Sequence, residues 1–142
     1  MRPMVASHRF VEHTSEVELE LQAGSLGELL AEAARALGEL LLHGDNVRLH
    51  ESETVLELAA HDEAALLVDW LNELVYFAEA ERWVPLDGEV VVERDAEGFR
   101  LRARLRRLHV ERAPSQVKAA TLHGVRVVEA EGRVTANVIL DV

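Results

Sequence analysis

Two stretches of the chain carry apolar residues at helical spacing, and the segments around them alternate apolar and polar positions. From Val17 to Leu21 apolar side chains occupy every second position, with Glu18 and Glu20 between them, which predicts a half-buried strand. Leucines and alanines then recur every three or four residues within 23–44 and again within 61–83. This pattern predicts two amphipathic helices.

The ends of both helices carry residues that favour a boundary. Ser25 followed by Glu28 three positions later matches a capping box, in which each side chain satisfies a free backbone N–H. Gly44 lies where a helix commonly stops, and Asp62 or its neighbour is the expected cap of the second helix.

The remaining segments alternate like strands. One is expected in 52–60, and the segment 88–110 predicts two strands joined by a turn at Asp95–Gly98. Two more are expected in 117–132 and 133–142. The order strand, helix, strand, helix and then several strands predicts an α+β fold with two helices packed on an antiparallel or mixed sheet. At 142 residues, a single domain spanning 1–142 is expected.

Composition and charge exclude several classes of function. The absence of cysteine removes disulfides, thiolate nucleophiles and cysteine-based zinc sites. A net charge of -11 disfavours direct binding of nucleic acid, so any link to RNA is expected to run through a protein partner. No apolar run is long enough for a membrane span and no secretion signal is visible, so a cytoplasmic location without membrane contact is expected.

The common catalytic motifs are also missing. There is no His-Glu-x-x-His pattern, no glycine-rich phosphate loop and no Gly-x-Ser-x-Gly nucleophile elbow. Common routes to zinc catalysis, nucleotide hydrolysis and acyl transfer are therefore not visible.

Two charged patterns leave alternatives open. A strand carrying Arg100, Arg102, Arg104 and Arg106 is typical of a phosphate-binding or docking stripe, but cross-strand pairing with acidic residues such as Glu89 and Glu93 is favoured. On the second helix, Asp69 and Glu73 lie one turn apart, a spacing that suits a hard cation but is more typical of a solvated face. Trp70 between them is expected to pack in the core.

Two carboxylates stand at strand ends. Glu16 immediately precedes Val17 and lies on the opposite face from it, and Asp141 ends a strand whose alternate residues are apolar. Either carboxylate can simply be solvated. If the two strand ends meet, their hard oxygen donors suit Ca²⁺ or Mg²⁺ better than a transition metal.

Four motifs taken together, EHTSE, LLVDWLNELVY, VKAATLH and ILDV, resemble the archease family across nearly the whole chain and in the same order. The resemblance implies an accessory protein and not an enzyme with its own substrate. Its expected partner is the RtcB-type RNA ligase, which joins RNA ends in tRNA splicing and RNA repair. The resemblance implies that the protein promotes ligase guanylylation and multiple turnover.

The same resemblance assigns a metal site. The family motif reads His-Thr-Ala-Asp, and its acidic residue and the aspartate near the chain's end match Glu16 and Asp141, which implies a bound divalent metal: calcium first, with magnesium or manganese as alternatives. Ser15 and Glu16 depart from the pattern, and glutamate is longer by one methylene. His13 and Thr14 are expected to orient the acidic loop.

Lys118 and His123 match family positions near the same surface. Lys118 is expected either to contact a phosphate or an acidic group of the ligase, or to pair with a carboxylate such as Asp141. The competing function is a general chaperone or binding module for nucleic-acid-processing enzymes. A small metal-dependent hydrolase using His13 and Glu16 is a third reading with thin support. The oligomeric state is left open.

Overall fold

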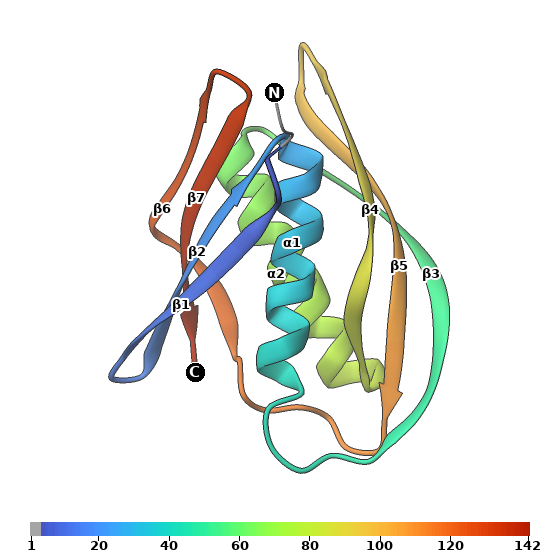
Figure 1. Cartoon of the computed structure of the whole chain (residues 1–142). Coiled ribbons are helices and arrows are strands. Elements are labelled where there is room, and N and C mark those ends of the chain that lie inside the picture. The colour runs from blue at the N-terminus through green and yellow to red at the C-terminus, as the bar shows by residue number, and fades with distance from the viewer. Residues whose placement is uncertain (1–3) are drawn as a thin grey trace.

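The computed structural model describes residues 4–142, in which seven strands and two helices are formed (Figure 1). In chain order they are β1 (Ser7–His13), β2 (Glu16–Ala23), α1 (Leu26–Leu41), β3 (Arg48–Ala60), α2 (Glu63–Glu81), β4 (Trp83–Asp95), β5 (Gly98–Val110), β6 (Ala119–Ala130) and β7 (Arg133–Asp141). None of the described helices is long and apolar enough to cross a membrane.

The strands form two separate sheets with the helices between them (Figure 1). One sheet has the order β1-β2-β7-β6 and the other the order β3-β5-β4, and every neighbouring pair is antiparallel. The α+β prediction is confirmed. The sequence left strand pairing open, because local alternation does not encode it, and in the described chain the strands divide between two sheets.

The helix caps form as the sequence predicts. The Ser25 hydroxyl accepts the Glu28 backbone N–H at 3.1 Å, and Asp62 Oδ1 accepts the Ala65 N–H at 2.7 Å. The Glu28 carboxylate accepts from the N–H of Gly24 at 3.2 Å, one residue before the position that a capping box requires. Each cap supplies an acceptor to a backbone group that the helix itself leaves free.

The two helices share one apolar core with the inner faces of both sheets. Trp70 is 0% exposed, and its Nε1 donates to the Leu30 carbonyl of α1 at 2.9 Å, so this indole joins the two helices. The packing role expected for Trp70 is confirmed. A buried Trp with a satisfied N–H contributes both apolar area and helix orientation.

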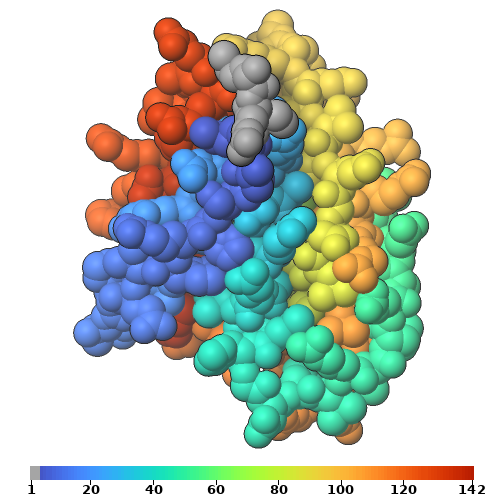
Figure 2. Space-filling view, viewed as in Figure 1, coloured from blue at the N-terminus to red at the C-terminus, as the bar shows by residue number. Residues whose placement is uncertain are grey.

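Helix α1 also lies close against the edge strand β4. A Cβ built on Gly27 would collide with the Val90 carbonyl, and one built on Gly38 with the Pro85 carbonyl. The two glycines therefore let the helix reach the strand backbone. Part of α1 is visible between the two sheets in the space-filling view (Figure 2).

Several local features differ from the sequence prediction. Strand β1 was not expected, because its polar and apolar residues alternate weakly and it lies at a sheet edge. Trp83 was expected at the end of the second helix but begins β4, because Arg82 adopts a left-handed conformation with φ 57° that ends α2. Strands β3 and β4 also begin several residues earlier than their alternation indicates.

Candidate acidic site at the strand ends

A tight hairpin positions the first acidic residue. Strand β1 ends at His13, β2 begins at Glu16, and Thr14 and Ser15 form the turn. Ser15 has φ 67°, a left-handed conformation that lets the chain reverse within two residues. Glu16 is therefore held at the start of a strand, where its backbone is fixed by pairing on both sides.

The second acidic residue arrives from the other end of the chain. Glu16 of β2 is the register partner of Asp141 of β7, and both side chains are exposed. Their neighbours Val17 and Leu140 are also register partners and are buried on the opposite face. Directly opposite residues of an antiparallel pair carry Cβ atoms about 4.5–5.5 Å apart. The meeting of strand ends that the sequence left conditional is present in the structure.

Backbone hydrogen bonds close this corner of the sheet. The Val142 N–H donates to the Ser15 carbonyl at 3.1 Å, and the Lys118 N–H donates to the Asp141 carbonyl at 2.8 Å. The register places His13 opposite Glu16, and Ala119 opposite Asp141. Four strands thus contribute one residue each to a row: His13, Glu16, Asp141 and Ala119.

The electrostatics of the row are unfavourable as they stand. Among residues 4–142, neither the Glu16 nor the Asp141 carboxylate forms an ion pair or a hydrogen bond with a cationic side chain. Like charges directly opposite one another destabilise a strand pair. The arrangement therefore weakens the sheet unless something positive lies between the two carboxylates.

The donor chemistry of the pair fits a hard cation. Two carboxylate side chains start from register partners on adjacent strands, and Ca²⁺ can complete its coordination with backbone carbonyls and water. In the described part of the chain, no group of three or more His, Asp or Glu side chains is placed to hold a metal. This also applies to Asp69 and Glu73 of α2.

Of the other predicted site residues, His13 belongs to the row, while Thr14, Lys118 and His123 lie outside it. Lys118 is exposed, and among the described residues its recorded link to Asp141 is through the backbone and not through an ion pair. His13 and Thr14 are exposed, and their orienting role stays a prediction. His123 is exposed on β6 beyond Thr121, where the strand leaves its register with β7.

Sequence reasoning missed Asn72. The side-chain Nδ2 donates to the Ala120 carbonyl at 3.0 Å, and Oδ1 accepts the Ala120 N–H at 2.8 Å. This amide ties α2 to β6 next to the row. The available signal was its place in the motif LLVDWLNELVY, as a polar residue among leucines.

A second missed cluster lies on the inner face of β1. The His8 side chain is 13% exposed, with Nδ1 2.6 Å from a Glu32 oxygen and Nε2 2.9 Å from a Glu39 oxygen. Burial lowers the pKa of His8, but its hydrogen bonds to both carboxylates raise it and prevail. Both ring nitrogens donate only in the imidazolium form. This cluster joins β1 to α1 and is separate from the acidic row.

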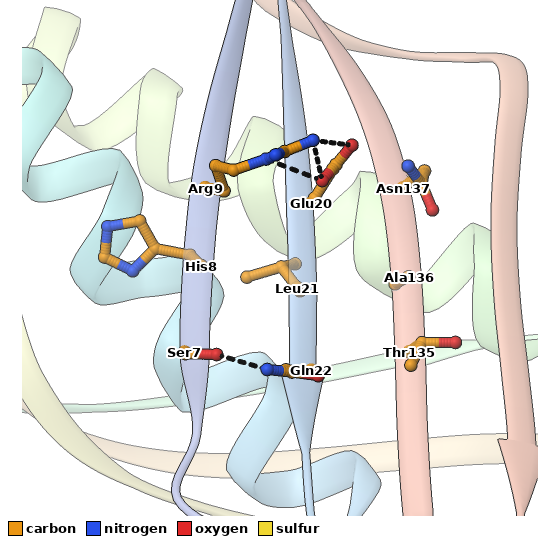
Figure 3. A pocket seen from close by; sticks show the side chains of 9 residues that line it. All are labelled: Ser7, His8, Arg9, Glu20, Leu21, Gln22, Thr135, Ala136 and Asn137. Carbon is orange, nitrogen blue, oxygen red and sulfur yellow. Dashed lines mark hydrogen bonds and ion pairs between the residues drawn. The ribbon is translucent and has the colours of Figure 1, made fainter.

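The outer face of the first sheet carries a shallow hollow of about 600 Å³ over β1, β2 and β7 (Figure 3). Arg9 donates to Glu20 through Nε at 3.0 Å and through a terminal nitrogen at 3.1 Å, and Gln22 donates to Ser7 at 2.9 Å. The charges that line it satisfy one another. Glu16 and Asp141 are not among its lining residues.

The arginines of β5 are flanked by acidic residues, but among residues 4–142 their ion pairs are with Glu51, Glu57 and Asp87 and not with the expected Glu89 and Glu93. Arg106 lies 2.6 Å from a Glu51 oxygen and 2.7 Å from an Asp87 oxygen. Hydrogen bonding to Arg106 lowers the pKa of Asp87. Arg102 lies 3.7 Å from Glu57 of β3, and the register sets Glu89 opposite Arg104 and Glu93 opposite Arg100.

Comparison with known proteins gives a consistent result. The model of the Archease protein family matches residues 8–142. A protein archease of Archaeoglobus fulgidus is 31% identical over 137 residues, which is 95% of this chain and 98% of that protein. A protein archease of Methanopyrus kandleri is 33% identical over 135 residues, covering 92% and 96% of the two chains.

Solved structures show the same fold. The solution structure of Methanobacterium thermoautotrophicum protein 1598 superposes with a TM-score of 0.69 at 24% identity, covering 95% of this chain and 98% of that one. The crystal structure of a Thermotoga maritima archease, described as a possible chaperone, gives a TM-score of 0.60 at 22% identity, covering 93% and 94%. These two likenesses support the fold.

Proposed function

Because this chain belongs to the archease family, we propose that it is an accessory protein that activates an RtcB-type 3′-phosphate RNA ligase in tRNA splicing or RNA repair. In this role it promotes guanylylation of the ligase and multiple turnover. It has no substrate of its own. The net charge of -11 supports docking on a basic, RNA-binding protein better than direct contact with RNA.

The observation that carries the proposal is the register of the two strand ends. Glu16 and Asp141 are separated by most of the chain, yet they are direct partners on the exposed face. Folding alone does not require two carboxylates to face one another, since the arrangement costs stability. A divalent cation between them would offset that cost and would justify its presence.

Each predicted site residue has a stated task in this proposal. Glu16 and Asp141 would hold the divalent cation, with calcium first and magnesium or manganese as alternatives. Such an ion supplies a fixed positive charge to whatever docks on this corner. His13 and Thr14 would shape the hairpin that carries Glu16, while Lys118, just before β6, and His123 on β6 are exposed and would contact the ligase.

The glutamate at position 16 leads to a specific expectation about cation affinity. It keeps the negative charge of the aspartate in the family motif but places it one methylene further from the backbone. The expected consequence is an altered cation affinity with the same dependence on Asp141. Glu16→Asp is therefore expected to change the affinity without abolishing activation of the ligase.

The test is a single-turnover guanylylation assay of the cognate ligase with GTP and divalent metal. Stimulation by the wild-type protein is expected, and Glu16→Gln and Asp141→Asn are each expected to reduce it about tenfold. Glu20→Gln is the matched control, because Glu20 lies on the same strand and face but is paired with Arg9. Equal stimulation by all four proteins would contradict the role of the acidic pair.

A chaperone or binding module for nucleic-acid-processing enzymes is the second candidate. The description of the Thermotoga maritima archease as a possible chaperone favours it. A chaperone would suppress aggregation of several unrelated client enzymes, without dependence on Glu16, Asp141 or divalent metal. Light scattering of heated clients, with and without the protein and a chelator, separates this candidate from the ligase activator.

A further inference from the structure

One polar residue of the second helix is explained neither by the core nor by the row. Within the motif 66–76, the leucines and Trp70 are buried in the shared core. Asn72 is half-buried and directs its amide at β6, where it makes two hydrogen bonds with the backbone of a single residue, Ala120. The amide donates at 3.0 Å and accepts at 2.8 Å.

This pair of bonds occupies the free edge of the sheet. Strand β6 is the last in the order β1-β2-β7-β6, so one side of its backbone has no neighbouring strand. Asn72 donates to and accepts from Ala120 as the backbone of a further strand would do. An unpaired edge otherwise frays or bonds only to water.

The segment held in this way is short and borders the acidic row. Only three register pairs join this part of β6 to β7: Ala119 with Asp141, Ala120 with Leu140, and Thr121 with Ile139. Register then resumes at Arg126 opposite Asn137, so that 122–125 stand against Val138 alone. Three register pairs, with the pairing interrupted after Thr121, hold this part of β6 to β7 only weakly.

We propose that Asn72 is a positioning residue for the acidic site, holding β6 against the end of β7 so that Asp141 stays opposite Glu16. The link runs from Asn72 through Ala120 to Ala119, the register partner of Asp141, and to Lys118, whose N–H bonds the Asp141 carbonyl at 2.8 Å. The consequence for a cation rests on the proposed function. The placement of Asp141 is tested without any cation.

The chain contains a matched control for this interaction. Asn46 makes the same pair of bonds to one backbone residue, donating to the Arg112 carbonyl at 2.8 Å and accepting the Arg112 N–H at 3.1 Å. It lies in the segment between α1 and β3, away from the row. Asn46→Ala therefore removes equivalent bonds without touching β6.

The first readout is amide hydrogen exchange followed by NMR in wild type, Asn72→Ala and Asn46→Ala. Asn72→Ala is expected to speed exchange of the Lys118 amide roughly tenfold relative to the amides of β2, while Asn46→Ala leaves this ratio unchanged. A purely structural contribution would instead raise exchange uniformly. An unchanged ratio in Asn72→Ala overturns the proposal.

If Asn72→Ala does not fold, Asn72→Asp serves in its place, because aspartate keeps the acceptor for the Ala120 N–H and replaces the donor with an oxygen that faces the Ala120 carbonyl. It is expected to increase the Lys118 ratio, and no increase overturns the proposal.

The second readout is calcium affinity by calorimetry, which is expected to fall about tenfold in Asn72→Ala and to stay unchanged in Asn46→Ala. Wild type that binds no calcium contradicts the proposed metal site, while the exchange ratio still decides the role of Asn72. Calcium affinity unchanged in Asn72→Ala, with wild type binding, overturns the link from Asn72 to the site.

Discussion

The outer face of the three-stranded sheet and the end row of the four-stranded sheet arrange their charges in opposite ways. On the three-stranded sheet, β5 presents a row of arginines whose register partners on β3 and β4 include Glu57, Glu89 and Glu93. At the end of the four-stranded sheet, register sets Glu16 against Asp141, with no recorded cationic partner among residues 4–142. The same antiparallel geometry therefore stabilises one face and strains the other.

Under the proposed function, the difference separates charges that stabilise the fold from charges that bind a cation. A sheet that alternates arginine with glutamate across its strands gains from each pair and needs no ligand. A sheet end that opposes two carboxylates gains only when a cation or a basic partner arrives. The contrast is the main physical support for a function at the acidic row.

The largest expected loss of stability comes from truncating a side chain in the core that the two sheets share. Trp70→Ala is expected to lower the free energy of unfolding by about 3–5 kcal/mol, because it empties a fully buried indole site and breaks its bond to Leu30. Urea unfolding followed by circular dichroism measures this loss. Tyr76→Ala on the same helix, where the side chain is 58% exposed, is the control with a small effect.

The next effect concerns the charge pairing of the three-stranded sheet. Arg106→Ala is expected to lower the melting temperature, by less than Trp70→Ala, because it leaves Glu51 and Asp87 without their shared guanidinium. The loss is expected to shrink at high salt, which screens exposed pairs. Arg100→Ala is the control, and an equal loss for both variants would refute the assigned pairing.

A smaller, pH-dependent effect is expected at His8. Its pKa in the folded protein lies above the ordinary 6.5, so the folded state binds more protons than the unfolded state between the two values. The stability that His8 contributes is therefore full below pH 6.5 and is lost as pH rises through the folded-state pKa. Urea unfolding of wild type and His8→Gln at several pH values measures this contribution. A difference in the free energy of unfolding that grows with rising pH would contradict the prediction.

The smallest expected change in stability concerns the two opposed carboxylates themselves. In a chelator, Glu16→Gln is expected to raise the free energy of unfolding by a few tenths of a kcal/mol, because it removes one of two opposed carboxylates. Glu20→Gln is expected to lower it slightly, because Glu20 is bonded to Arg9. Urea titrations of both variants determine whether each free energy of unfolding rises or falls. A loss of stability in Glu16→Gln would contradict the claim that Glu16 and Asp141 repel one another.

Local signals in the sequence predicted the helices well and the strand partners poorly. Ser25 and Asp62 indicated both helix starts, because capping depends on residues only three positions apart. The weak alternation of Ser7–His13 concealed β1, and no local pattern indicates that the strands divide between two sheets.

At the site, too, local patterns were predicted from the sequence, whereas contacts between distant elements were not. The family motifs pointed to Glu16 and Asp141, and alternation placed each on the exposed face, but their exact register needed the fold. Asn72 was not identified, because its task depends on where the free edge of β6 lies relative to α2. Contacts between distant elements are set by packing, which residue spacing does not encode.

The most direct test of the acidic row is calorimetric titration of the protein with calcium, without the ligase. The account predicts that wild type and Glu20→Gln bind alike, whereas Glu16→Gln and Asp141→Asn each bind more weakly. Binding that is absent in wild type, or equal in all four proteins, would contradict the claim that the opposed carboxylates are there to hold a cation.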